Sequence, residues 1–152
     1  MCFTPTSRPP IAPIHGGALD GTRIELTASD GAKLAAYRAR ASDPTGNGIV
    51  ILPDMRGLYS FYEELALRFA EAGVDAVAID WFGRTAGTAP RPPDFEHMPH
   101  VAQTTWAGIS ADISAGVAEL RAASGGQDGA VSTVGFCFGG RMAFDSATLG
   151  LG

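Results

Sequence analysis

The alternation of hydrophobic and polar positions changes near residue 49. Before it, residues 22–28 (TRIELTA) alternate polar and apolar side chains, and residues 33–40 (KLAAYRAR) do so more weakly. The turn signal Ser29-Asp30-Gly31 lies between them, so the pattern predicts a β-hairpin with one solvated face. Residues 49–52 (IVIL) and 74–79 (VDAVAI) are instead apolar almost throughout, which is typical of strands buried on both faces.

Two segments carry the three-and-four spacing of amphipathic helices, residues 61–72 and residues 104–123. Gly73 supplies a stop for the first. The predicted inner stripes are Tyr62, Leu65 and Phe69 in the first helix, and Trp106, Ile109, Ile113, Val117 and Leu120 in the second.

A third short strand is expected at 130–134, followed by a helix or a loop at 139–148. Strands that alternate with helices predict right-handed crossovers and a parallel sheet. The predicted fold class is therefore α/β: a three-layer sandwich with a mostly parallel sheet, preceded by the antiparallel hairpin. Residues 1–20 contain four prolines and are expected to form an extended arm, and residues 21–152 belong to one domain.

The connection across residues 81–100 holds four prolines, which predicts that it lacks regular structure. It follows the carboxyl end of a predicted parallel strand, where such sheets bind ligands, so we expect it to overhang a site.

Composition narrows the function classes. Apolar residues make up 45% and charged residues 18%, as in globular proteins, and the net charge of −5 gives no reason to expect a nucleic-acid or anionic-membrane partner. No apolar run approaches the roughly 18 residues of a membrane span, and the N-terminus lacks the features of a secretory signal. Two cysteines form no disulfide framework, so a reducing, cytoplasmic location is expected.

The motif with the clearest chemistry is Gly135-Phe136-Cys137-Phe138-Gly139, directly after the third predicted strand. A glycine two residues to either side of a nucleophile is the pattern of a nucleophile elbow, here with cysteine in place of serine. Gly135 and Gly139 relieve the close contact across the turn, and Gly140 lets the helix begin near the sheet. The helix N-terminus favours thiolate, and the Phe138 N–H is positioned to donate to an oxyanion.

The motif has three other interpretations. A cysteine between aromatic residues is often a buried core residue. The glycines could form a phosphate-binding turn, but the G-x-G-x-x-G spacing and the Lys-Ser/Thr pair are missing. A thiol-redox pair of Cys2 and Cys137 has no C-x-x-C context.

The elbow GFCFGGR after AVSTV, together with ILPDMRGLYSFYEELALRFAEAGVDAVAIDWFGRTAG, resembles the dienelactone hydrolase family of the α/β-hydrolase fold. The resemblance covers about residues 22–148. It implies Cys137 as the nucleophile, the backbone N–H groups of Met55 and Phe138 as the oxyanion hole, and Asp54 where the family has a glutamate that contacts the cysteine. An alternative role for Asp54 is a loop cap before the following helix.

The resemblance also concerns the proline-rich connection, where arginines of dienelactone-cleaving members hold the substrate carboxylate. At that place this chain has His97 and His100, with Arg84 and Arg91 nearby but out of register. Plain surface roles are expected for both arginines. Trp81 and Arg84 are nevertheless the candidates for substrate-loop residues.

In this fold the acid and the histidine follow the nucleophile, but after Cys137 the chain has Asp145 and no histidine. The chain is therefore expected to be the N-terminal part of a longer enzyme. A genuine short form would leave the elbow strand as an open edge, which self-association could cover.

The leading hypothesis is a hydrolase of small activated esters or lactones, with the acid and the histidine beyond residue 152. No cofactor and no metal are expected, because no His/Cys cluster has ligand spacing and no Rossmann glycine pattern follows an early strand. The alternative is a catalytically incomplete module that acts by association.

Overall fold

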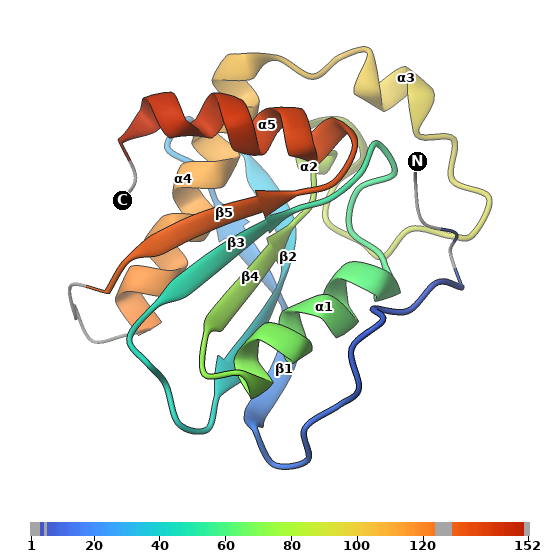
Figure 1. The fold of residues 1–152 in the computed structure, drawn as a ribbon. Helices are drawn as coiled ribbons and strands as arrows, with labels where there is room; N and C mark the ends of the chain where they lie inside the picture. The colour runs from blue at the N-terminus through green and yellow to red at the C-terminus, as the bar shows by residue number, and fades with distance from the viewer. Residues whose placement is uncertain (1–3, 5, 124–128, 151–152) are drawn as a thin grey trace.

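A computed structural model describes residue 4, residues 6–123 and residues 129–150 of the chain (Figure 1). Cys2, and with it the redox interpretation, lies outside the described residues, as do residues 1–3 and 5 of the expected arm. The five strands are β1 (Ala18–Thr27), β2 (Lys33–Ala41), β3 (Gly48–Leu52), β4 (Asp75–Ile79) and β5 (Val131–Gly135).

The five strands form one mixed sheet in the order β1-β2-β4-β3-β5. The predicted hairpin pairs β1 with β2 antiparallel, from Thr27 opposite Lys33. β2 joins β4 antiparallel, and β3 pairs in parallel with both β4 and β5. Within the described residues β5 pairs only with β3, so its outer edge is open, as the sequence predicted.

Helices cover both faces of this sheet and complete the predicted three layers (Figure 1). α1 packs on one face, and α4 and α5 pack on the other. The helices are α1 (Ser60–Glu71), α2 (Gly83–Ala86), α3 (Met98–Val101), α4 (Trp106–Ala123) and α5 (Phe138–Ser146), followed by the 3₁₀ turn η1 (Ala147–Leu149).

Two clusters of buried side chains form the core, one on each face of the sheet. Strand β3 contributes to both, because successive side chains of a strand point to opposite faces. Ile49 and Ile51 pack with α1, whereas Val50 and Leu52 pack with α4 and Met142 of α5. The prediction that the apolar run at residues 49–52 forms a strand covered on both faces is therefore confirmed.

Three sequence expectations need correction. β1 begins at Ala18, so the hairpin takes in the end of the predicted arm. The connection 81–100 contains α2 and part of α3, because Pro99 stands in the first turn of α3, where a missing N–H costs no helical hydrogen bond. Trp106 is 40% exposed, because it begins α4 at the solvent end, while the other four members of its stripe are buried.

The described part of the arm runs along α1 towards the N-terminal end of that helix (Figure 1). Near the far end of α1, the Ile14 N–H donates to the Glu71 carboxylate at 2.9 Å. Farther along, the exposed Arg8 lies 3.7 Å from Glu64. The arm thus passes from the carboxyl end of the helix to the edge of the sheet where the candidate site lies.

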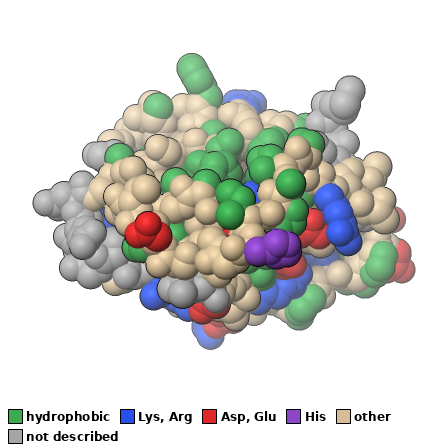
Figure 2. Space-filling view, turned by 60° about the horizontal axis from the view of Figure 1, so that its bottom comes forward, with side chains coloured by type: hydrophobic (Ala, Val, Ile, Leu, Met, Phe, Trp, Pro, Cys, Tyr) green, Lys and Arg blue, Asp and Glu red, His purple; other side chains and the backbone are tan. Residues whose placement is uncertain are grey.

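The surface in Figure 2 carries interspersed basic and acidic side chains. Over the described residues of this face, no broad band of one charge stands out. None of the described helices combines the length and the apolar character needed to cross a bilayer.

Candidate functional site

The candidate site lies at the carboxyl ends of β3 and β5. From β3 the chain crosses over to β4 on one side, and β5 lies on the other side, so the strand order reverses between these two neighbours. Loops that leave such a switch point diverge and open a crevice, which is where α/β sheets bind ligands. Two turns border it: the β3–α1 turn, residues 53–59, and the elbow, residues 135–140.

The elbow holds Cys137 in a strained backbone conformation. Its φ is 54° and its ψ is −113°, and it is the one non-glycine with positive φ among the described residues. A side chain at positive φ costs free energy, of order 1–3 kcal/mol, that the surrounding fold must offset. Cys137 is exposed, so the interpretation as a buried core cysteine is wrong.

The glycines around Cys137 make this turn sterically feasible. A Cβ at Gly135 would collide with the carbonyl oxygen of Gly139. One at Gly139 would collide with the carbonyl oxygens of Leu52 and Pro53, so only glycine lets the elbow rest on the end of β3. Gly140 is less restricted, because its Cβ would lie 3.3 Å from the Gly135 oxygen.

Two backbone donors flank the turn. Phe138 begins α5, and the first N–H groups of a helix have no partner within it. Among the described residues, neither this N–H nor that of Met55 donates a hydrogen bond. The two turns are in direct contact, because the Phe136 N–H donates to the Leu52 oxygen at 3.2 Å. Cys137, as the N-terminal flank of α5, also lies at the positive end of the helix dipole.

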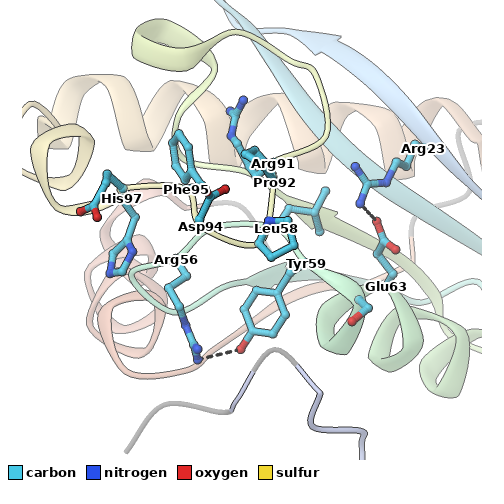
Figure 3. A pocket seen from close by; sticks show the side chains of 13 residues that line it. Arg23, Arg56, Leu58, Tyr59, Glu63, Arg91, Pro92, Asp94, Phe95 and His97 are labelled. Atoms are coloured by element: carbon cyan, nitrogen blue, oxygen red, sulfur yellow. Dashed lines mark hydrogen bonds and ion pairs between the residues drawn. The ribbon is translucent and has the colours of Figure 1, made fainter.

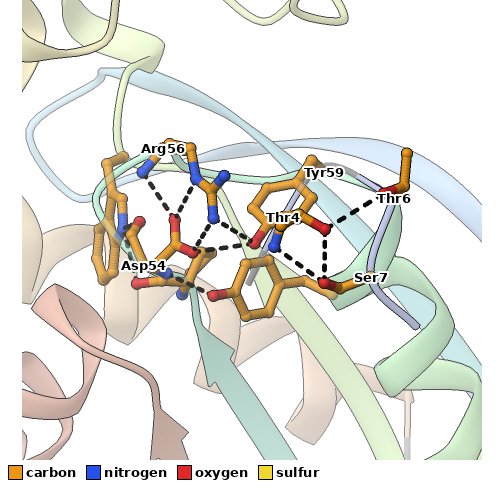
Figure 4. A network of polar contacts seen from close by, with 9 residues as sticks. Thr4, Thr6, Ser7, Asp54, Arg56 and Tyr59 are labelled. Carbon is orange, nitrogen blue, oxygen red and sulfur yellow. Dashed lines mark hydrogen bonds and ion pairs between the residues drawn. The ribbon is translucent and has the colours of Figure 1, made fainter. Parts of the chain in front are cut away.

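Asp54, next to Met55, is fully buried and organises the β3–α1 turn (Figure 4). Its carboxylate accepts from the Arg56 backbone N–H at 2.9 Å, from Arg56 Nη2 at 3.0 Å and from the Tyr59 hydroxyl at 2.9 Å. Its own N–H donates to the Tyr62 hydroxyl at 2.8 Å. The carboxylate thus caps its own loop before α1, which agrees with the alternative interpretation of Asp54 as a loop cap.

The two tyrosines of this network are held in the neutral form. Burial raises the pKa of Tyr59, and the hydrogen bond to the Asp54 carboxylate raises it further. Burial is also the main cause that raises the pKa of Tyr62, with the negative charge of Asp54 adding to it. Figure 4 shows Thr4, Thr6 and Ser7 of the arm, which hydrogen-bond one another, beside Tyr59. The arm therefore reaches the border of the site.

Trp81, a predicted substrate-loop residue, is buried beneath the two turns. Its Nε1 donates to the carbonyl oxygens of Pro53 and Asp54 at 3.3 and 3.2 Å, and its ring meets the Phe138 ring edge-on at 5.6 Å. Trp81 therefore links the β3–α1 turn to the elbow from below. It is 3% exposed.

Arg84, the other predicted substrate-loop residue, bridges two carboxylates. It pairs with the buried Asp112 of α4 at 2.6 Å and with Asp30 of the β1–β2 turn at 2.8 Å. Desolvation raises the pKa of Asp112. Arg84 borders a cavity of only about 30 Å³ and is exposed, as expected of a surface arginine, and its guanidinium joins three parts of the fold.

For Arg91 the expected plain surface role is wrong, since its side chain is 12% exposed. It pairs with the buried Asp80 at 2.8 Å and donates to the carbonyl oxygens of Ala86 and Gly87. The Asp80 carboxylate accepts from the Leu58 N–H at 2.9 Å as well. This carboxylate therefore ties the proline-rich connection to the β3–α1 turn.

A cavity of about 480 Å³ opens beside the β3–α1 turn (Figure 3). It lies between that turn, the start of α1 and residues 91–97 of the connection. Its lining consists of Arg23, Arg56, Leu58, Tyr59, Ser60, Glu63, Arg91, Pro92, Pro93, Asp94, Phe95, Glu96 and His97.

The histidines of the connection have different surroundings. His97 lines the cavity, and His100 hydrogen-bonds Thr85 at 2.9 Å while stacking on Phe95. Across the part of the chain that the structure describes, no group of three or more His, Cys, Asp or Glu side chains is arranged to hold a metal ion.

The sequence reasoning did not identify Tyr59, Tyr62, Asp80 or Arg56 as site residues. The tyrosines at a spacing of three gave a signal, because the first precedes α1 and the second lies in its first turn. Asp80 gave another, as a single carboxylate at the carboxyl end of a buried strand.

Comparison with known proteins agrees with this geometry. The profile of the dienelactone hydrolase family matches residues 34–152. Carboxymethylenebutenolidase of Pseudomonas putida is 31% identical over 134 residues, which cover 84% of this chain and 56% of that protein. The chain thus spans little more than half the length of this relative.

Two solved structures share the α/β-hydrolase-like fold. m3DLH superposes with a TM-score of 0.71 at 24% identity, over 89% of this chain and 56% of that one. A dienelactone hydrolase-like promiscuous phosphotriesterase, P91 from metagenomic libraries, gives 0.64 at 23% identity, over 86% and 55%. With the family profile matched over most of its length, the chain belongs to the dienelactone hydrolase family.

Proposed function

We propose that this chain carries the nucleophile and the oxyanion-binding half of a hydrolase that cleaves small activated esters or lactones. One observation carries the proposal: an exposed cysteine is held at positive φ in front of α5, and the N–H groups of Met55 and Phe138 on the two turns have no partner within the described residues. A buried, relaxed cysteine would need none of these features.

In the proposed reaction, the Cys137 thiolate attacks the carbonyl carbon of the ester or lactone, and the carbonyl π electrons move to oxygen. The Met55 and Phe138 N–H groups stabilise the resulting oxyanion, a type of contact worth roughly 10²–10³ in rate per donor. Collapse of this intermediate breaks the bond to the leaving alkoxide or enolate oxygen, which takes up a proton. A thioester at Cys137 remains, and water then releases the acid and restores the thiol.

We infer that Asp54 acts by positioning. It is the residue that the family resemblance places near the cysteine, and the bonds described for its carboxylate go to Arg56 and Tyr59. Holding that turn fixes the backbone of the neighbouring Met55. Trp81 supports the same segment from below, through its hydrogen bonds to the Pro53 and Asp54 oxygens.

The general base and its orienting acid complete the proposal. In the family order they follow the nucleophile, and the one acid after Cys137 is Asp145, which lies on α5 within 3.5 Å of Arg141. We propose that a histidine and an aspartate come from the part of the relatives' length that this sequence does not span.

The test is acylation by a 4-nitrophenyl ester, since this step needs the nucleophile and the oxyanion hole only. We expect a burst of one nitrophenolate per chain and a mass increase of one acyl group, mapped by peptide fragmentation to Cys137. Cys137→Ala removes both signals. A chain that reacts no faster than an unstructured cysteine peptide would leave the alternative, a non-catalytic module that acts by association.

A further inference from the structure

The cavity beside the β3–α1 turn has the size of a small-molecule site. Its volume of about 480 Å³ falls in the usual range of roughly 300–1,000 Å³. Side chains of Leu58, Tyr59, Pro92, Pro93 and Phe95 give it an apolar and aromatic lining, and Figure 3 labels four of them, Leu58, Tyr59, Pro92 and Phe95. Such a lining suits an apolar acyl group.

The cavity lies next to the proposed reaction centre. Arg56 lines it and is the residue after Met55, while Tyr59 lines it and donates to the Asp54 carboxylate. On the other side of this segment, the Tyr62 ring lies 5.8 Å from the Phe136 ring, one residue before Cys137. The β3–α1 turn and the start of α1 thus border both the cavity and the elbow.

Three arginines line the cavity, but each is already paired with a carboxylate. Arg23 pairs with Glu63 at 2.6 Å, Arg56 with Asp54 at 3.0 Å and Arg91 with Asp80 at 2.8 Å. Two of these partner acids, Asp54 and Asp80, are almost completely buried and have no access to another counter-ion. Recruiting Arg56 or Arg91 to a substrate carboxylate would leave the buried charge of Asp54 or Asp80 unpaired, which is strongly unfavourable.

The remaining charges of the lining are negative. Asp94 and Glu96 are exposed, and neither has a hydrogen bond or an ion pair among the described residues. Figure 3 shows Asp94 among the lining side chains near Phe95. Because the arginines are neutralised within the protein, these two carboxylates determine the charge that a bound group meets.

We propose that this cavity is the acyl pocket and that it selects substrates whose acyl chain is neutral or cationic, discriminating against a carboxylate there. The inference rests on the proposed function of Cys137. It assigns a substrate class by charge: apolar esters or lactones, without an acidic group on the acyl side.

The test uses three 4-nitrophenyl esters with acyl chains of equal length that end in a tert-butyl, a trimethylammonium or a carboxylate group. Acylation of Cys137 is followed as the nitrophenolate burst, and each rate constant is divided by that of a small free thiol, which removes intrinsic reactivity. We expect the carboxylate ester to react about tenfold more slowly than the neutral one at low salt, because of like-charge repulsion.

The double variant Asp94→Asn/Glu96→Gln should reduce this difference to within about threefold. Its matched control, Asp20→Asn/Asp43→Asn, also removes two exposed carboxylates, outside the lining, and should keep the tenfold difference. If the carboxylate ester reacts as fast as the neutral ester or faster, the inference is overturned while the proposed function stands. The same holds if Asp94→Asn/Glu96→Gln leaves the tenfold difference unchanged. Failure of all three esters to acylate Cys137 overturns both.

Discussion

The elbow and the β3–α1 turn, both at the carboxyl edge of the sheet, connect a strand to a helix in different ways. Both follow a buried parallel strand, both lead into a helix, and they touch through the Phe136–Leu52 hydrogen bond. The elbow needs only two residues between strand and helix and places strain on Cys137. The β3–α1 turn uses seven residues and a fully buried carboxylate that accepts hydrogen bonds from Arg56 and Tyr59.

The difference separates two requirements of a reaction centre. The elbow exposes the Cys137 side chain, and Gly135 and Gly139 permit the close backbone contacts that its tight turn requires. The β3–α1 turn exposes a backbone N–H at Met55 and fixes it with side-chain hydrogen bonds around Asp54. Substitutions that add side-chain volume should therefore destabilise the elbow most. Substitutions that remove a hydrogen-bonding group should instead destabilise the β3–α1 turn most.

The largest effect is expected at Gly139. Gly139→Ala places a Cβ against the backbone oxygens of Leu52 and Pro53, which no rotamer change can relieve, and should lower the free energy of unfolding by about 3 kcal/mol or more. Urea unfolding measures this. Gly140→Ala is the matched control, because its Cβ meets nothing closer than 3.3 Å, and we expect a change within about 1 kcal/mol. Equal losses would mean that the elbow is not sterically restricted at Gly139.

The next effect is expected at Asp54. Asp54→Asn keeps the volume but leaves Arg56, which is three-quarters buried, without its counter-ion, so the free energy of unfolding should fall by about 2 kcal/mol. Acylation of Cys137 should slow about tenfold as the Met55 N–H loses its fixed position. The exposed Asp43→Asn serves as control, with changes below about 0.5 kcal/mol. An intact acylation rate in a destabilised Asp54→Asn variant would remove the positioning role.

A third effect concerns alkaline pH. All three tyrosines of the chain, Tyr37, Tyr59 and Tyr62, have a raised pKa in the fold, mainly through burial. Because the folded pKa exceeds the unfolded value of 10, this stability is complete below pH 10 and is lost as the pH rises above it. We expect phenolate absorbance to appear only together with unfolding. Tyr37→Phe should leave this coupling of phenolate absorbance to unfolding unchanged. Titration of Tyr59 and Tyr62 at pH 10 in the folded protein would contradict the prediction.

The smallest effect is a gain. Cys137→Gly removes the penalty of a side chain at positive φ and should raise the free energy of unfolding by about 1 kcal/mol while abolishing acylation. Met55→Gly, on the other turn, should give no gain, because Met55 has no positive φ to relieve. If both glycine variants lose stability equally, the strain is not concentrated in the elbow.

Much of the fold could be predicted from the sequence, because the spacing of apolar residues shows which faces of each strand or helix are covered by neighbouring elements. The runs at 49–52 and 74–79 became the doubly covered strands β3 and β4. The elbow was predictable for a similar reason, since its steric demands fall on glycines two residues away. The short helix α3 was missed, because a proline in the first turn of a helix is tolerated where one in its interior is not.

The charge network of the site could not be predicted. Arg84 and Asp112 lie 28 positions apart and meet only once α2 and α4 pack on the same sheet face. Arg91 and Asp80 are 11 positions apart, across a turn whose path the sequence does not specify. Ion pairs of this kind depend on tertiary distances, and no local pattern of residues encodes them.

The most direct test of the central claim compares two reactions of Cys137 in a Cys2→Ser background, which leaves one thiol in the chain. Alkylation by iodoacetamide forms no oxyanion, whereas acylation by 4-nitrophenyl acetate does. Relative to an unstructured cysteine peptide, we expect the acylation rate to be enhanced about a hundredfold more than the alkylation rate. Equal enhancement of both reactions would show an accessible thiol without an oxyanion hole and would contradict the account.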